Sequence, residues 1–426
     1  MDTTSMVSLN TTDFVSLAME TIRSGQSTCV MCFQAPCAVE DMRDAIRYMI
    51  TIYPKLRSII EPTLFSYKMR ILADDDPRVA ILFKNVFHVR RNVTYDSQQY
   101  RDMIREIHNE PFSLEQTIPI KVYYFPDDPK PMFLARIHHM VCDGSSGVHF
   151  VHSLMACLNG LKPPQLPVDD PNIYPVILEK PYSNVPLQFL RSVLLTRKDI
   201  QAAKDDIIIP STDRPASFFG PVDVYQYTLA HDFSVVKAKA KVLGVSLNTL
   251  LITALAVSLT KGPGKNKGNT VGVPIAMDLR TYFKDQKPVF GNYLRIFMVR
   301  LHRKNWTDYR RALAEIDSQM NEFKSRIEKK QLLVPVLIEN MYKMIGRKNI
   351  AWAARYLKQR KALFTNTCVF STLGNWDMIN SFGTKVQACE AIGNSASQPF
   401  MVLWNTLHGK IHTIRHSRKP NILRKM

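Results

Sequence analysis

The stretch MFLARIHHMVCDGSSGVHFVHSLMACLNGL (132–161) constrains the fold of this chain more than any other. An apolar, strand-like run ends in two histidines, and an aspartate–glycine pair leads into a helix-forming segment. Successive side chains of a strand alternate between its faces, so His138 and His139 should point to opposite sides. Gly144 allows a tight turn, and a following serine can cap the helix. The stretch predicts a strand, a turn and a helix that hold one imidazole rigidly.

The two histidines of this segment have two possible interpretations, a catalytic one and a structural one. Imidazole is the side chain best suited to proton transfer near neutral pH, and a positioned base is worth about 10²–10⁴-fold in rate. Asp143 could orient the ring or brace the loop through an arginine. In the structural alternative, His138 and His139 are core histidines with satisfied hydrogen bonds, beside an aspartate that caps a helix. The local sequence leaves both readings open.

Periodicity along the rest of the chain predicts strands alternating with helices in two similar halves. The 426 residues exceed one ordinary core, so two or three domains are expected. We expect a two-lobed α/β protein, with a first lobe over 1–175, a crossover linker over 176–215 and a second lobe over 216–426. The predicted helices cover 8–23, 38–57, 97–112, 147–161, two within 233–261, and much of 306–361. The predicted strands lie at 29–36, 78–90, 118–125, 132–139, 222–230, 268–280, 291–301, 366–376 and 398–416.

The charge of the chain points to polyanionic partners. The formal net charge is +19 and the pI is near 9.6, which favours nucleic acid, an anionic membrane, a phosphorylated cofactor or an acidic carrier protein. Known nucleic-acid-binding motifs are absent from the sequence, so nucleic acid is the weakest of these. The segments 187–200 and 342–364 mix apolar residues with Lys and Arg. We interpret them as ordinary amphipathic helices, with contact with a membrane surface as the alternative.

The cysteines and the N-terminal sequence indicate a reducing compartment. Seven scattered cysteines and the lack of a signal-like start favour reduced thiols and a cytoplasmic location, with peripheral membrane contact as the alternative. Cys29 and Cys32 form a C-x-x-C motif, but a strand would place them on opposite faces. We therefore interpret them as core residues and predict no metal site.

The segment HHMVCDG (138–144) matches the HHxxxDG motif of the condensation-domain superfamily. That superfamily includes condensation domains of nonribosomal peptide synthetases, alcohol and polyketide-associated acyltransferases, and wax ester synthases. Weaker similarities follow in the family's order, so the resemblance spans about residues 10 to 415. Thr372 stands where the family's S-N-L-G pattern has asparagine, and the plant-type DFGWG motif is absent. The weaker segments are YPKLR (53–57), EPFSLEQTIPIKVYYF (110–125), GVSLNTLLITALAVSL (244–259), VPIAMDLR (273–280), VFGNYLRIF (289–297) and VFSTLG (369–374).

The resemblance implies two chloramphenicol-acetyltransferase-like lobes in a V with a central tunnel. An acyl thioester, on coenzyme A or on the phosphopantetheine arm of an acidic carrier protein, would meet an alcohol or amine acceptor there. The acceptor, a small molecule or a lipid, would attack the thioester directly, without an acyl-enzyme. No permanently bound cofactor is implied, the residues that contact the donor stay unknown, and a monomer is expected.

The resemblance also assigns roles to individual residues. His139 takes the part of the general base, and His138 supports the loop. Asp143 pairs with Arg280, and Gly144 provides a close backbone approach. Ser371 is the candidate that helps to hold the oxyanion, with Asn292 in a supporting position. The competing hypothesis is a non-catalytic relative that binds a carrier protein or an acyl chain as a scaffold.

Overall fold

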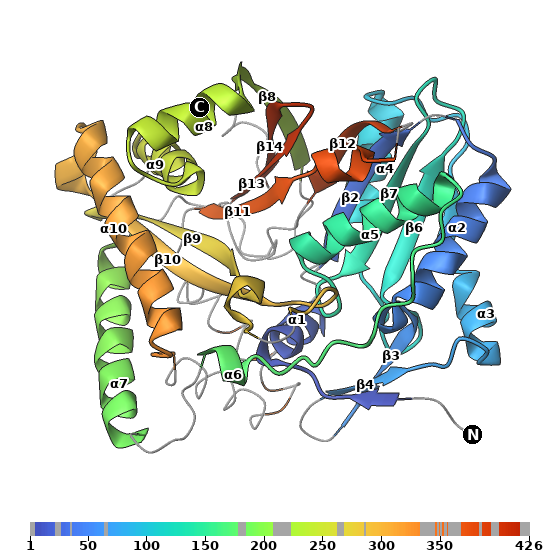
Figure 1. Cartoon of the computed structure of the whole chain (residues 1–426), viewed down its shortest axis with the longest axis horizontal. Helices are drawn as coiled ribbons and strands as arrows, with labels where there is room; N and C mark the ends of the chain where they lie inside the picture. The colour runs from blue at the N-terminus through green and yellow to red at the C-terminus, as the bar shows by residue number, and fades with distance from the viewer. Residues whose placement is uncertain are drawn as a thin grey trace.

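The computed structural model of the chain has two lobes side by side, each built around a β-sheet (Figure 1). The expected helix over 342–364 and the end of the expected linker lie almost wholly outside the part of the chain that is described. The structure describes residues 5–21, 27–34, 36–63, 67–177, 185–207, 223–261, 268–284, 287–332, 346, 349, 352, 356, 368–382, 386–392 and 400–417.

The first half of the chain forms most of one lobe and a small three-stranded sheet of order β1-β4-β3. The five-stranded sheet of this lobe has the order β12-β2-β7-β6-β5, with only β5 and β6 parallel. Its elements are β1 (Ser5–Val7), α1 (Thr11–Thr21), β2 (Ser27–Gln34), α2 (Val39–Ile52), η1 (Pro54–Arg57), β3 (Ser58–Pro62), β4 (Tyr67–Ile71), α3 (Pro77–Phe83), β5 (Phe87–Val89), α4 (Gln98–Asn109), β6 (Ile120–Phe125), β7 (Met132–His138) and α5 (Gly144–Leu158).

The strand that ends at the two histidines has apolar neighbours on both faces. Phe133, Ala135 and Ile137 belong to the large core shared with α2 and α5. Met132 and Leu134, which alternate with them, belong to a smaller core with α4. A strand covered on both faces reads as a continuous apolar run, which explains the sequence of β7. By the same alternation, His138 lies on the α4 side of the sheet.

The second half of the chain forms a six-stranded sheet of order β10-β9-β11-β13-β14-β8. In it, β9, β11 and β13 run parallel and the other pairs are antiparallel. Its elements are α6 (Tyr174–Ile177), α7 (Val185–Ala202), η3 (Ala203–Asp205), β8 (Asp223–Asp232), α8 (Phe233–Val242), α9 (Leu247–Thr260), β9 (Thr270–Asp278), η4 (Arg280–Tyr282), β10 (Leu294–His302), η5 (Arg303–Asn305), α10 (Tyr309–Glu328), β11 (Cys368–Asn375), η6 (Asp377–Asn380), β12 (Val386–Ile392), β13 (Phe400–Leu407) and β14 (Lys410–Ser417).

The second sheet also has apolar residues on both faces. Val402 and Trp404 of β13 lie in a core with α9 and α10. Leu403, between them, belongs to the core of the first lobe, as does Phe290 from the loop before β10. The two lobes are therefore joined by a shared hydrophobic core as well as by the chain.

The predicted boundaries of the two lobes and the linker (1–175, 176–215 and 216–426) stay a prediction. One strand from the expected second lobe belongs to the sheet of the first. β12 (Val386–Ile392), within the expected second lobe, pairs antiparallel with β2 and extends the sheet of the first lobe. The region expected as a linker contains α7, a helix of 18 residues. The fold class, an α/β protein of two lobes, is confirmed.

One predicted strand segment is instead a helix. Residues 78–83, expected in a strand, lie in α3 (Pro77–Phe83), and only Phe87–Val89 is extended. The Asp76 side chain caps the helix by accepting a hydrogen bond from the Arg78 amide, and Pro77 occupies the first helical turn. Both residues are helix-start signals that override the β-branched run.

The helices were also compared with the length and hydropathy of a membrane span. Over the described residues, no individual helix is long and apolar enough to cross a bilayer. α8 and α9 reach that threshold only as a pair, by length and composition, and they are bent by 94° at their junction.

Candidate active site

Asp143 forms the centre of the loop that follows the two histidines. It is fully buried and caps α5, and its carboxylate accepts hydrogen bonds from the Ser146 amide (3.0 Å) and the Tyr293 amide (2.9 Å). Arg280 donates to both of its oxygens, at 2.7 and 3.1 Å. Burial raises the pKa of Asp143, but the Arg280 guanidinium and these hydrogen bonds outweigh it and hold the pKa below its usual range.

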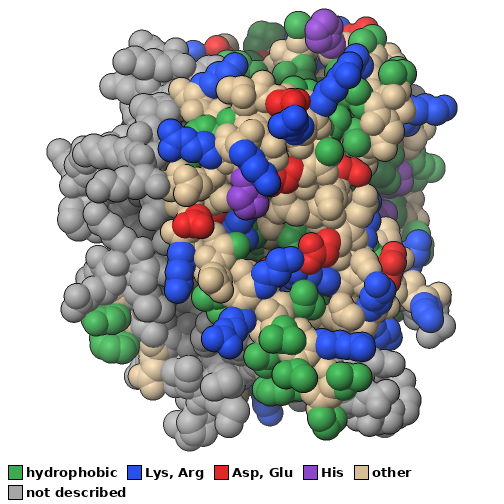
Figure 2. Space-filling model, turned by 90° about the vertical axis from the view of Figure 1, so that its left-hand side faces the viewer, with side chains coloured by type: hydrophobic (Ala, Val, Ile, Leu, Met, Phe, Trp, Pro, Cys, Tyr) green, Lys and Arg blue, Asp and Glu red, His purple; other side chains and the backbone are tan. Residues whose placement is uncertain are grey.

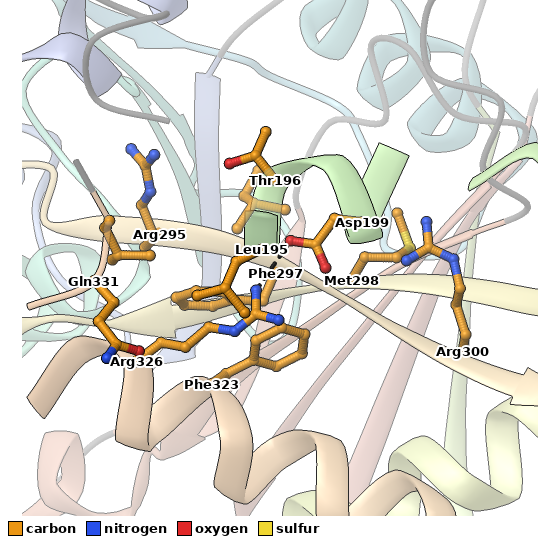
Figure 3. A pocket seen from close by; sticks show the side chains of 12 residues that line it. Leu195, Thr196, Asp199, Arg295, Phe297, Met298, Arg300, Phe323, Arg326 and Gln331 are labelled. Atoms are coloured by element: carbon orange, nitrogen blue, oxygen red, sulfur yellow. Dashed lines mark hydrogen bonds and ion pairs between the residues drawn. The ribbon is translucent and has the colours of Figure 1, made fainter. Parts of the chain in front are cut away.

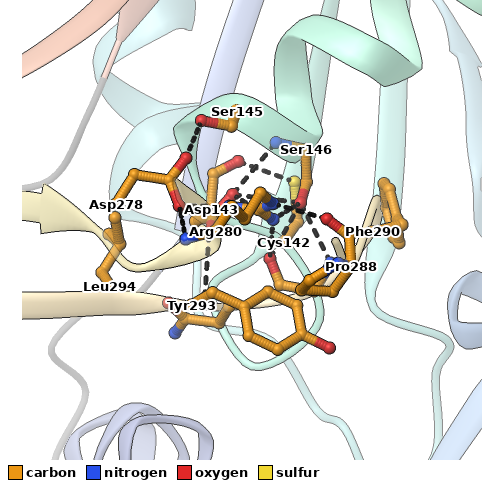
Figure 4. Close-up of polar contacts among 12 residues, drawn as sticks. Cys142, Asp143, Ser145, Ser146, Asp278, Arg280, Pro288, Phe290, Tyr293 and Leu294 are labelled. Carbon is orange, nitrogen blue, oxygen red and sulfur yellow. Dashed lines mark hydrogen bonds and ion pairs between the residues drawn. The ribbon is translucent and has the colours of Figure 1, made fainter. Parts of the chain in front are cut away.

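Arg280 joins the two lobes through this contact (Figure 4). Besides Asp143, its guanidinium donates to Asp278 Oδ1 (3.1 Å), to Ser146 Oγ (2.9 Å) and to the carbonyl of Pro288 (3.0 Å). Burial lowers the pKa of Arg280, but the two carboxylates more than reverse this, so it is raised overall. The arginine is therefore held as a cation between the HHxxxDG loop of one lobe and β9 of the other.

Gly291 lies where the two lobes come closest. Its carbonyl accepts hydrogen bonds from the Asp143 amide (3.1 Å), Ser146 Oγ (2.8 Å) and Arg280 (3.2 Å), and its amide donates to Ser146 Oγ (3.0 Å). A Cβ at this position would lie 2.5 Å from the ring of Tyr293. No larger residue fits without displacing that ring, which explains the glycine.

Two further polar residues hold the loop 288–293 in place. Asp169, near the end of the expected first lobe, accepts hydrogen bonds from the amides of Val289 and Phe290, each at 2.7 Å. Buried Lys55 donates to the carbonyl of Phe290 at 3.1 Å. Burial lowers the pKa of Lys55, and the nearby carboxylates of Asp13 and Asp169 offset part of that effect. The loop is thus fixed by two separate segments of the expected first lobe and by Arg280 of the second.

His139 is the partly exposed member of the histidine pair. Its backbone carbonyl accepts a hydrogen bond from Asn292 Nδ2 at 2.7 Å, so the loop 288–293 positions the residue directly. Burial lowers the pKa of His139 to about 4, while Asp143 and a hydrogen bond with the Cys142 backbone act in the opposite direction. The ring is neutral at pH 7 and can accept a proton.

His138 has a different environment. It is fully buried, its Nδ1 accepts a hydrogen bond from the Met140 amide (3.1 Å), and its ring meets Phe112 edge to face. Nε2 lies 3.6 Å from Glu20 Oε2, so the ring proton is on Nε2 and faces that carboxylate. His138 therefore braces the strand end, while His139 is the partly exposed residue of the pair.

Gly144 packs against β11 across the boundary between the lobes. A Cβ at Gly144 would lie 2.6 Å from Leu373 Cδ2 of β11, and Gly144 is not among the described glycines with positive φ. The glycine is therefore required for close packing rather than for a special turn. Ser371 shares the face of β11 with Leu373, because Phe370 points into the core of the second lobe. Its contact with a reacting oxygen stays a prediction.

Several residues of this site were not identified from the sequence. Ser146 contacts Asp143, Arg280 and Gly291, and Ser145 Oγ donates to Asp278 across the lobes at 2.7 Å. Other contributions come from Asn10, which donates to the Asn292 carbonyl at 2.9 Å, and from Lys55 and Asp169. The sequence marked the two serines only as candidate helix caps, and that prediction is wrong, because Asp143 caps α5. Lys55 lies within YPKLR, but neither it nor the distant Asn10 and Asp169 carried a signal for this site.

No family model and no curated protein sequence matches this chain. Solved structures do match it. The first condensation domain of the CDA synthetase is 13% identical with a TM-score of 0.68, covering 98% of this chain and 92% of that one. The TRI3 trichothecene 15-O-acetyltransferase from Fusarium sporotrichioides is 12% identical with a TM-score of 0.68, covering 99% and 94%. The epimerization domain of the third module of tyrocidine synthetase B is 14% identical with a TM-score of 0.66, covering 97% and 91%.

These likenesses extend over nearly the whole chain at low sequence identity, so they establish the fold. The chain has the two-lobed fold of condensation domains and of the acetyltransferase that shares it. The resemblance drawn from HHMVCDG is confirmed at this level.

Proposed function

We propose that this chain is an acyltransferase that moves an acyl group from a thioester to an alcohol or an amine. The observation that carries the proposal is the environment of His139. His139 is a partly exposed residue with a neutral ring, its carbonyl is held by Asn292, and its loop is locked by the buried Asp143–Arg280 pair. A neutral imidazole on a rigid loop meets the first requirements of general-base catalysis.

In the proposed reaction, the acceptor O–H or N–H gives its proton to the ring of His139 as the acceptor atom attacks the thioester carbonyl. A tetrahedral intermediate forms, and its oxyanion accepts a hydrogen bond from the hydroxyl of Ser371. The C–S bond then breaks, and the protonated ring returns the proton to the departing thiolate. The products are an ester or amide and a free thiol, so no acyl-enzyme and no resident cofactor is needed. Asp143 and Arg280 act by positioning the loop.

The low pKa of His139 suits the second half of this sequence. A ring with a pKa near 4 is a modest base, but its protonated form is a strong acid. It therefore returns the proton readily to a thiolate whose own pKa is about 8.5. We include in the proposal that the donor thiol is coenzyme A or a carrier-bound phosphopantetheine. The acceptor is proposed only as an alcohol or an amine.

The test is release of free thiol from acyl-coenzyme A thioesters in the presence of a panel of alcohols and amines, with the product identified by mass. His139→Ala should lower turnover by about 10²–10⁴-fold while the circular dichroism spectrum is unchanged. The matched control is His152→Ala, because His152 is a partly exposed histidine on α5, beside Phe382 and outside the Asp143–Arg280 contacts. Full turnover by His139→Ala would refute the mechanism.

The second candidate is a binding protein without catalysis. One similar structure is the complex of an X-domain with OxyB from teicoplanin biosynthesis, at 12% identity and a TM-score of 0.61. A chain of this fold could likewise present a surface to another protein. If acyl donors bind while no panel member and no carrier-bound donor yields free thiol, this candidate replaces the first.

A further inference from the structure

α7 turns a row of leucines toward solvent. Leu187, Leu190 and Leu194 are spaced i, i+3 and i+7, which places them on one face of the helix. Their exposed fractions are 48%, 55% and 57%. A single exposed leucine needs no explanation, but a contiguous apolar row marks an interaction surface.

The inner face of α7 is fixed, so this orientation is set by packing. Ser192 is buried, and Asp199 accepts a hydrogen bond from Arg326 of α10 at 2.9 Å. Leu195, Thr196 and Asp199 line a pocket of about 210 Å³ against the edge strand β10 and α10. Figure 3 shows Asp199 directed toward Arg326, with the stacked rings of Phe297 and Phe323 below them. The leucine row therefore lies on the opposite side of the helix.

Basic side chains flank the same row. Arg191, Arg197 and Lys198 are exposed, and helical geometry places each within one turn of a leucine on the outer face. Arg197 and Lys198 also line a shallow surface groove together with Leu194. Figure 2 views the molecule from this side and shows hydrophobic side chains gathered low on it, with Lys and Arg side chains around them. We call this surface the α7 face.

We infer that the α7 face binds the surface of an anionic membrane. The leucines would enter the boundary between headgroups and acyl chains, while the three cations contact anionic headgroups. The net charge of +19 favours the same partner. A second copy of the chain fits less well, because it would bring three cations against three others. This inference does not depend on the proposed acyl transfer.

The first test is co-sedimentation of the full chain with vesicles of phosphatidylcholine, with and without phosphatidylserine. The wild type should bind the mixed vesicles more strongly. Leu190→Gln/Leu194→Gln should weaken that binding about tenfold or more, because two half-exposed leucines lose their transfer into lipid. The matched control is Ile81→Gln/Val242→Gln, which removes two exposed apolar residues (62% and 81% exposed) from other surfaces and should leave binding within about twofold.

The second test reverses the charge of two basic residues and compares pairs that change the net charge by the same amount. Arg191→Glu/Lys198→Glu should weaken binding to the mixed vesicles about fivefold or more per site. Lys84→Glu/Lys130→Glu changes the net charge equally at two exposed lysines of the first lobe and should have a much smaller effect. Raising the salt from about 0.1 M to about 1 M should weaken wild-type binding as the charges are screened.

A fluorescence measurement separates loss of binding from loss of folding. Leu190→Trp keeps an apolar residue on the α7 face, and its emission should shift to the blue when phosphatidylserine vesicles are added. The inference is overturned if the wild type binds neither vesicle type, or if Leu190→Gln/Leu194→Gln leaves vesicle binding unchanged. It is also overturned if the two charge-reversed variants weaken binding equally. Sedimentation velocity gives a further outcome that overturns it: the wild type is a dimer, the Leu190→Gln/Leu194→Gln variant is a monomer, and both bind vesicles equally.

Discussion

His139 shows how two neighbouring residues of the same type acquire different chemistry. The alternation of β7 sends the ring of His138 into the α4 side of the sheet, where Met140 and Glu20 fix its tautomer. His139 follows the last residue of the strand, and it lies near a carboxylate that is already neutralised by Arg280. Asp143 therefore raises the pKa of His139 less than burial lowers it.

The pH dependence of turnover should report the lowered pKa of His139. With an alcohol acceptor, which does not titrate, activity should persist as the pH falls below 6.5 and reach half its plateau near the pKa of His139, about 4. The unfolded chain binds a proton at this histidine below about pH 6.5 and the native chain does not, so stability also falls in that window. Circular dichroism at each pH separates the two effects. A half-maximum near pH 6.5 in the folded protein would contradict the assignment.

The Asp143–Arg280 pair makes a second prediction at this scale. Asp143→Asn keeps the shape of the side chain but leaves a buried guanidinium with Asp278 as its remaining carboxylate. The free energy of unfolding should fall by about 3 kcal/mol in urea titration, the lower end for breaking a buried pair. Asp127→Asn, in the exposed pair with Arg91, is the matched control and should lower the stability far less, because water already solvates that pair. Equal losses would mean that burial contributes nothing to the pair.

At the level of elements, local patterns predicted most helices and strands, and the misses have definite causes. Residues 78–83 look like a strand by composition, but the Asp76 cap and Pro77 start a helix there. β12 was not predicted, because its partner β2 lies some 350 positions earlier in the chain and no local signal marks that pairing. In the HHxxxDG segment the strand–turn–helix order was predicted correctly because it lies within one short stretch, but the helix begins at Gly144 and is capped by Asp143 rather than by the expected serine.

The contact between α5 and β11 can be tested through Gly144. Alanine there brings a Cβ to within 2.6 Å of Leu373 Cδ2, so the side chain of Leu373 or the helix must move. Gly144→Ala should cost about 1–3 kcal/mol of stability by urea titration and displace the loop that carries His139, lowering turnover. Leu373→Ala in the same chain removes the obstructing methyl group and should restore part of both. If the double variant is no better than Gly144→Ala, the restriction at Gly144 has another cause.

At the scale of the whole molecule, the two lobes share too many contacts to unfold separately. The core of the first lobe includes Phe290, Leu403 and Leu407 from the second half of the chain. β12 extends the first sheet, and Arg280 binds Asp143 across the boundary. The first lobe completes neither its sheet nor its core without residues from the second half of the chain. The sequence motifs predicted two lobes, but they carried no information on the strand and core residues that the second half of the chain contributes to the first lobe. That contribution depends on contacts between distant segments.

Calorimetry tests that coupling directly. Ile46 of α2 and Ile316 of α10 are fully buried, one in each core, and replacing either by alanine should cost about 2–5 kcal/mol. The wild type should show one thermal transition, and both variants should shift that whole transition to lower temperature. Adding Asp143→Asn weakens the connection between lobes and should broaden the transition of either variant. Two transitions in the wild type, with each isoleucine variant moving only one, would show that the lobes are independent folding units.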